Sequence, residues 1–240
     1  MKTVYWASFP DQSPHSLSEL RYAAPESLLN DMTPMEYFGP MAGRCPSIIS
    51  ECRNTFKIAS PIDLHLTFNS DFTSCNSKYQ QDWEFIQQMI GTIGPERIVQ
   101  LSAPTYLFYC EEPMTMTQLP AYYEETEFTN TCIGVSGTYN INSWMRPVKP
   151  TFKLKKNVTI IDIKMDDALC YYKFNCEEKV QLVRFDADDF NKNNILKNIL
   201  TYKYNTKHRF VPTRLSDGYA AFMQARYNKK IIKIIKENLL

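Results

Sequence analysis

The stretch Val148-Lys149-Pro150-Thr151-Phe152-Lys153-Leu154 decides the fold class of this chain. Its apolar side chains Val148, Phe152 and Leu154 stand at even positions, and its lysines stand at odd ones. Successive side chains of a strand point to opposite faces of a sheet, so this pattern predicts a strand with one buried and one solvated face. We expect that strand to cover residues 147–155.

Short segments of the same kind lie on both sides of this stretch. We expect strands over 1–8, 56–59, 62–68, 97–102, 104–110, 114–119, 131–135, 138–142, 158–163, 168–175 and 179–186. A short helix is expected over 47–54, and a longer one over 79–91, where Trp83, Ile86 and Ile90 recur at helical spacing. Residues 69–78 between them read as a polar loop. Many short strands at close spacing favour an α+β fold, with a mostly antiparallel β-sandwich or jelly-roll-like core and peripheral helices.

The 240 residues fit a single domain, 1–240, with three parts. Residues 1–46 hold six prolines and are expected to wrap around the core, because proline resists both helix and sheet. Residues 47–186 are the β-rich core. Residues 187–240 form a helical, basic C-terminal extension.

Composition excludes several classes of protein. The seven glycines form neither a GxxxxGK[ST] nor a GxGxxG loop, which argues against P-loop nucleotide enzymes and Rossmann dehydrogenases. The first residues carry no apolar run of signal-peptide length, and no window of 18 apolar residues predicts a transmembrane helix. The seven cysteines are an odd number, which favours free thiols in a reducing, intracellular compartment.

Charge is distributed unevenly along the chain. The net charge is +1, yet residues 1–120 hold seven Lys and Arg against 13 Asp and Glu. Residues 201–240 hold nine Lys and Arg against two acidic residues, a net charge of +7. The basic surface is expected at Lys203, Lys207, Arg209, Lys229, Lys230, Lys233 and Lys236. Three interpretations stay open: a surface for nucleic acid, membrane or an acidic partner, a helix docked by its isoleucines, or a segment that meets the acidic residues 1–120.

Motifs for metal binding or catalysis are weak in this sequence. None of the three histidines, His15, His65 and His208, stands in an HxH, HxD or HExxH pattern, and no metal or cofactor is expected. A Cys–His–acid set could be drawn from Cys45, His65 and Asp63, but nothing in the sequence places them together. His65 is better explained as a surface or partner-bonded histidine on a strand. We expect no catalytic residue.

Six segments between residues 44 and 190 carry a family resemblance. They are Arg44-Cys45-Pro46, residues 54–63 (NTFKIASPID), Pro120-Ala121-Tyr122, residues 137–147 (GTYNINSWMRP), residues 166–174 (DDALCYYKF) and Val183-Arg184-Phe185. In these segments and their order the chain resembles a family of uncharacterised proteins encoded by T4-like bacteriophages of marine bacteria. The resemblance implies a phage accessory protein in an infected bacterium, located in the host cytoplasm or in the virion. It implies no activity.

One of these segments also holds the best candidate for a ligand or partner site. Tyr139, Asn140, Asn142, Trp144 and Arg146 make residues 139–146 the most polar and aromatic turn region of the chain. An arginine beside a tryptophan can stack on the ring or bind a carboxylate or phosphate. The alternative is a structural arginine that pairs with a carboxylate and fixes a turn.

These observations favour a phage-encoded, non-enzymatic accessory protein that acts by macromolecular binding. We expect a phage or host protein as partner, with nucleic acid as an alternative through residues 201–240, and a homo-oligomer remains an option. A second hypothesis is a virion structural or assembly component. A third is an enzyme on small metabolites or nucleotides, with Arg146 at the centre of an anion site.

Overall fold

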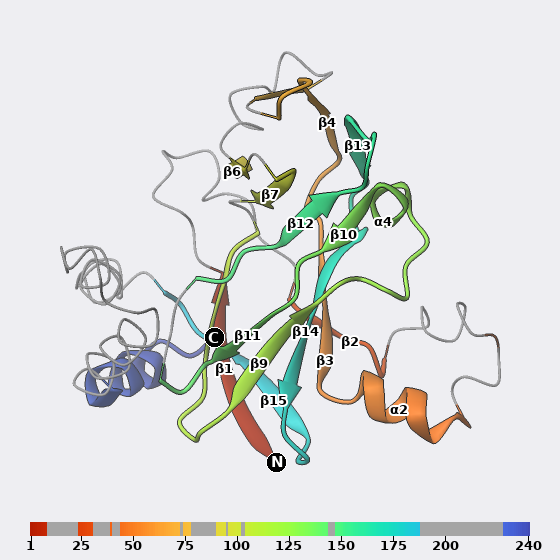
Figure 1. Cartoon of the computed structure of the whole chain (residues 1–240). Helices are drawn as coiled ribbons and strands as arrows, with labels where there is room; N and C mark the ends of the chain where they lie inside the picture. Colours follow the sequence, from red (N-terminus) through yellow and green to blue (C-terminus); the bar gives the residue numbers. More distant parts are fainter. Residues whose placement is uncertain are drawn as a thin grey trace, which may run out of the picture.

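The structure is a computed structural model that describes residues 1–8, 24–30, 39, 44–72, 74–77, 90–94, 96–101, 104–143, 147–187 and 228–240. Two β-sheets packed face to face dominate it (Figure 1). The first sheet has the order β15 (Val180–Arg184), β1 (Lys2–Ser8), β8 (Tyr106–Tyr109), and β1 runs parallel to β15 but antiparallel to β8. The second sheet is antiparallel throughout, in the order β11 (Gly137–Asn140), β9 (Thr115–Leu119), β14 (Ala168–Asn175), β3 (Thr55–Ala59), β2 (Glu26–Ser27).

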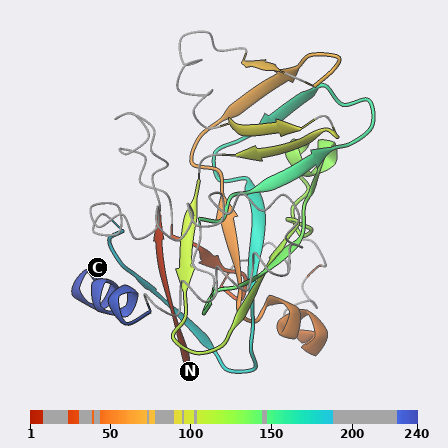
Figure 2. The same cartoon turned by 60° about the vertical axis from the view of Figure 1, so that its left-hand side comes forward.

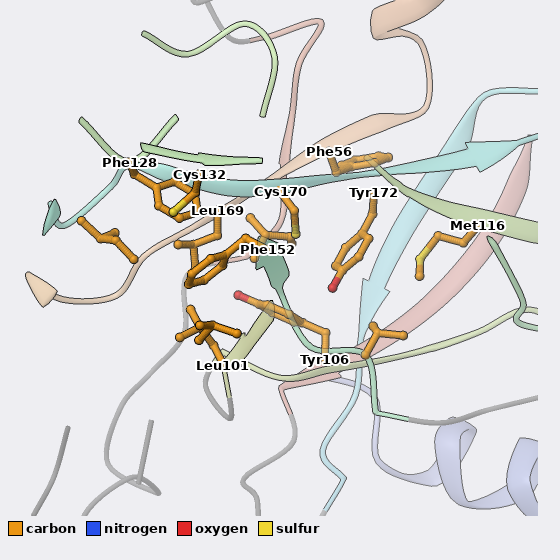
Figure 3. Packing of buried hydrophobic residues seen from close by; sticks show 14 of the residues in the cluster. Phe56, Leu101, Tyr106, Met116, Phe128, Cys132, Phe152, Leu169, Cys170 and Tyr172 are labelled. Atoms are coloured by element: carbon orange, nitrogen blue, oxygen red, sulfur yellow. The ribbon is translucent and has the colours of Figure 1, made fainter. Parts of the chain in front are cut away.

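Aromatic side chains fill the space between these two sheets. The ring of Phe108 on β8 meets Tyr172 and Phe174 on β14 edge to face, with ring centroids 5.3 and 5.5 Å apart. Phe56 on β3 lies against Phe174 in the same way. Figure 3 shows Tyr172 and Tyr106 pointing into this core between the strands. The prediction of an α+β fold with a mostly antiparallel, sandwich-like core is confirmed.

Two smaller sheets extend the core at one end of the sandwich (Figure 2). One has the order β10 (Cys132–Gly134), β12 (Thr151–Leu154), β7 (Ile98–Leu101), β6 (Ile90–Gly94), and the other β13 (Ile160–Ile163), β4 (Leu64–Phe68), β5 (Cys75–Ser77). Their buried residues belong to the same hydrophobic cluster as the sandwich. The short helix α4 (Glu127–Thr131) adds Phe128, whose ring meets Phe152 edge to face at 5.1 Å.

Helices cover the outer faces of both main sheets. Ala7, Leu107 and Tyr109 alternate with the core residues of β1 and β8, and they pack against the helix formed by residues 228–237, which we call the C-terminal helix (Figure 1). On the outer side of the second sheet, α2 (Pro46–Cys52) packs through Cys52 in a cluster with Tyr171. The β1–β8 pair is therefore covered on both faces. In agreement, all four residues of β8 are buried.

The stretch that decided the fold class is divided in two. Val148 exchanges both backbone hydrogen bonds with Tyr106, so it lies at the edge of the first sheet. β12 begins only at Thr151, after Pro150, and pairs with β7 and β10. Proline has no N–H for a strand ladder, and the chain uses it to pass from one sheet to the next. The prediction of a strand over 147–155 is correct about which side chains are buried. It is wrong that the strand is continuous, because the chain changes sheet at Pro150.

Most of the other predicted elements are present, two differ, and one helix is additional. The prediction of a helix over 79–91 is wrong at its C-terminal end, because Ile90 begins β6. Residues 79–89 lie outside the described residues. The expected loop 69–78 contains β5. Helix α4 was not expected: Thr126 caps it by accepting the N–H of Thr129, and the Thr129 hydroxyl returns a bond with the N–H of Thr126.

Candidate functional site

The predicted turn region after β11 uses its amides to hold its own backbone. The side-chain oxygen of Asn140 accepts the backbone N–H groups of Asn142 and Ser143, each at 3.3 Å. The Asn142 amide donates to the carbonyl oxygens of Glu111, at 2.8 Å, and Cys110, at 3.3 Å. Such bonds fasten a turn to the neighbouring β8–β9 connection. Asn140 and Asn142 thus have structural roles.

Of the other candidates for a ligand site, the structure describes Tyr139 but not Trp144 and Arg146. Tyr139 is half-buried and packs against the main hydrophobic cluster. Trp144 and Arg146 lie outside the described residues, so the anion site centred on Arg146 stays a prediction. The structure brings Tyr139, Asn140 and Asn142 together on one strand and turn, and it gives them packing and turn-fastening contacts.

Four lysines of the predicted basic surface lie exposed on the C-terminal helix. Ile231 and Ile235 are fully buried and Ile234 is 6% exposed, in a cluster with Leu107, Tyr109 and other residues of the first sheet. Burial of one such side chain contributes about 1.5–3 kcal/mol, so this apolar stripe is a main contribution to the docking of the helix on the sheet. Lys229, Lys230, Lys233 and Lys236 are exposed on the other side. Lys203, Lys207 and Arg209 lie outside the described residues.

Two of these lysines are engaged in ion pairs. The Lys236 ammonium lies 2.9 Å from a carboxylate oxygen of Glu111, and this contact raises the pKa of Lys236. Lys233 lies 3.8 Å from Glu237, one helical turn away. Within the part of the chain that the structure describes, Lys229 and Lys230 have no ion pair. The helix is therefore docked by its isoleucines, as the second interpretation predicted, and its lysines face outward; a surface for nucleic acid, membrane or an acidic partner stays a prediction.

A second charged group lies on the outer face of the second sheet. Glu51 of α2 accepts a bond from Lys173 of β14 at 2.6 Å and one from the Tyr122 hydroxyl at 3.1 Å. The bond from Lys173 holds the pKa of Glu51 below its usual value, while burial raises the pKa of Tyr122 well above its own. Lys57 of β3 lies between Glu26 and Glu124, at 3.9 and 4.0 Å. Each charge in this group has an opposite partner, which favours a structural network.

The Cys–His–acid set drawn from the sequence does not form. His65 on β4 takes its carboxylate from Asp162 on the neighbouring strand β13, with Nδ1 and Oδ1 2.5 Å apart. Asp63 instead accepts the backbone N–H of Met165 at 2.7 Å. His65 is thus the partner-bonded strand histidine that the alternation predicted. Among the described residues, no group of three His, Cys, Asp or Glu side chains could hold a metal ion.

One thiol has a lowered pKa. Cys45 stands at the N-cap position of α2, half-buried, and the backbone N–H groups of Ile48 and Ser47 lower its pKa. Sequence spacing gave no sign of this, because the cause is the local geometry of a helix start. Since no described residue supplies a base beside this thiol, it supports no catalytic assignment.

Comparison with known proteins adds no relative. No family model matches the chain, and no curated protein and no solved structure matches it. None of the helices in the described ranges is long and apolar enough to cross a membrane.

Proposed function

We propose that this protein is a phage-encoded, non-enzymatic accessory protein that binds another macromolecule through the lysine face of its C-terminal helix. One observation carries the proposal: the isoleucine stripe of the helix is buried against the first sheet, which fixes Lys229, Lys230 and Lys233 on the outward side. A docked helix presents its charges in a set geometry, so a partner meets them at little entropic cost.

The chemistry of this face favours an acidic protein as the partner. Side chains three and four residues apart lie on one side of a helix, so Lys229, Lys230 and Lys233 make a compact positive patch. Nucleic-acid binders usually have a strongly basic domain, whereas this chain has a net charge of +1 and a pI near 7.5. A small positive patch on a near-neutral protein suits carboxylates on a partner surface, where it speeds and orients association.

Charge reversal tests this proposal in lysates of infected host cells. The test variant carries Lys229→Glu, Lys230→Glu and Lys233→Glu; the control is Lys179→Glu, an exposed lysine in the turn before β15. We expect the wild type and the control to retain one protein at near-equal molar amounts and the test variant to lose it. Equal retention by all three proteins would overturn the proposal.

Two further results would also contradict it. A retained partner that nuclease treatment releases would assign the lysine face to nucleic acid. A fixed copy number of the protein in purified virions would place it in the particle instead of the host cytoplasm, in accordance with a structural or assembly role.

A further inference from the structure

A second exposed surface lies on the small sheet β10-β12-β7-β6, away from the C-terminal helix (Figure 2). Ile133 of β10 stands directly opposite Lys153 of β12, and Lys153 stands opposite Ile98 of β7. Residues opposite each other in a ladder point to the same face, so these three side chains form one row. We call this row, with Lys155 and Lys156 that follow it, the isoleucine–lysine surface.

The row faces outward because its neighbours face the core. Cys132, Phe152 and Val99 alternate with the three row residues and are 5%, 1% and 0% exposed. Ile133 is 54% exposed, one of the most exposed large apolar side chains of the described chain, and Ile98 is half-buried. Single exposed apolar residues are common, but here two lie in register on either side of a lysine.

The charge of this surface is not neutralised within the described residues. Lys153, Lys155 and Lys156 are exposed, and the part of the chain that the structure describes gives none of them an ion pair. The Lys155 ammonium donates one bond, to the carbonyl oxygen of Thr129 at 3.1 Å. Elsewhere on the sheets lysines are paired: Lys57 with Glu26 and Glu124, and Lys173 with Glu51. Three positive charges within four positions repel one another, and a bound anion would lower this repulsion.

We infer that the isoleucine–lysine surface binds an acidic segment of a partner protein, whose apolar side chains cover Ile133 and Ile98 and whose carboxylates meet Lys153, Lys155 and Lys156. Protein interfaces combine an apolar centre with a charged rim, and this surface has both within one row of a sheet. A nucleic-acid backbone would satisfy the lysines but leave the isoleucines uncovered. The lysine face of the C-terminal helix lacks such a centre, since its isoleucines are already buried.

A designed peptide pair tests this inference by fluorescence anisotropy on the whole chain. The probe is a fluorescein-labelled peptide of alternating Glu and Leu, and its matched control alternates Glu and Ser. We expect the Glu–Leu peptide to bind about tenfold more tightly than the Glu–Ser peptide, because one well-placed apolar contact changes the affinity by about this factor. Ile133→Thr should remove that preference, and the double variant Lys153→Glu, Lys156→Glu should weaken both peptides about tenfold.

Two control variants separate this surface from the rest of the molecule. Lys179→Glu should bind both peptides like the wild type, and the triple charge reversal of the C-terminal helix should keep the about tenfold preference for the Glu–Leu peptide, so the proposed function and this inference fail independently. The seven positions changed on the surface or in the controls are all exposed, and urea unfolding checks that each variant is folded. Equal binding of the two peptides, or unchanged binding by the Lys153 and Lys156 variant, would overturn the inference. A DNA duplex that displaces the Glu–Leu peptide would overturn its assignment to a protein segment.

Discussion

The Nζ atom of Lys236 lies 2.9 Å from a carboxylate oxygen of Glu111, which joins the C-terminal helix to the turn after β8. The hydroxyl of Tyr5, on the strand beside β8, donates to the same oxygen at 3.3 Å. The basic end of the chain thus meets its acidic first half within one molecule at this point, as one of the three interpretations of the charge distribution predicted. Lys233 pairs with Glu237 of its own helix, and within the described residues Lys229 and Lys230 have no ion pair.

The isoleucine stripe should dominate the attachment of the C-terminal helix. Ile235→Ala removes a fully buried side chain and should lower the free energy of unfolding by about 2–5 kcal/mol, because the transfer and cavity terms add. Urea unfolding measures this. Ile133→Thr is the matched control, since that side chain is 54% exposed, and it should change stability by less than about 0.5 kcal/mol. Equal losses from the two variants would contradict a docked helix.

A buried tyrosine beneath this helix carries an unsatisfied hydroxyl. Tyr109 is fully buried, and no described residue bonds its oxygen. Tyr109→Phe should therefore leave the free energy of unfolding unchanged or raise it slightly, because no hydrogen bond is lost. Tyr122→Phe is the comparison: it loses the bond to Glu51 and should cost about 0.5–1.5 kcal/mol. A larger loss of stability from Tyr109→Phe than from Tyr122→Phe would contradict an unsatisfied Tyr109 hydroxyl.

Alkaline pH should destabilise the fold. Burial raises the pKa of Tyr109 and Tyr123 to about 12, and that of Cys132 and Cys170 to about 12. Their unfolded values are 10.0 for tyrosine and 9.0 for cysteine, so above these values the unfolded chain loses protons that the folded chain keeps. Stability should be complete below about pH 9 and fall between about pH 9 and about pH 12. Urea midpoints along this range measure it, and Tyr109→Phe should make the fall shallower.

The cysteines should differ sharply in reactivity. Cys45 is half-buried with a lowered pKa, whereas burial raises the pKa of the equally half-buried Cys176 and of the buried Cys75. Since the thiolate is the reactive form, an aromatic disulfide reagent at neutral pH should modify Cys45 first. The Cys45→Ser variant should lack the fast phase. A fast phase that persists in that variant would show that another thiol is the more reactive one.

The sequence predicted the sheets well because alternation is a local property. Val4 and Trp6, or Phe152 and Leu154, reveal their buried face without knowledge of their partners. Pairing between strands is not local, and neither the parallel β1–β15 pair nor the change of sheet at Pro150 could be predicted. The prediction of a helix over 79–91 is wrong at its C-terminal end. Ile86 and Ile90 are four residues apart, and this spacing places two side chains on one face of a strand as well as on one face of a helix. Gly91, which lies at the irregularity between β6 and β7, was the contrary signal.

The candidate sites were predictable only where charge and periodicity coincide. The spacing of isoleucines and lysines near the C-terminus predicts an amphipathic helix, with Ile231, Ile234 and Ile235 on one side and the lysines on the other. The isoleucine–lysine surface was missed, because only strand register places Ile98 and Ile133 beside Lys153. The sequence favours Asn140 and Asn142 as ligand candidates, whereas their amides hold the turn, a distinction that depends on backbone geometry.

Site-specific photo-cross-linking in infected cells tests whether the docked C-terminal helix presents its lysine face to an acidic protein. Benzoylphenylalanine placed at position 230 should give one discrete protein adduct, which is absent when the probe is at position 179. Lys229→Glu with Lys233→Glu should abolish that adduct. No adduct at position 230 above the level at position 179, or an adduct that nuclease removes, would contradict the account.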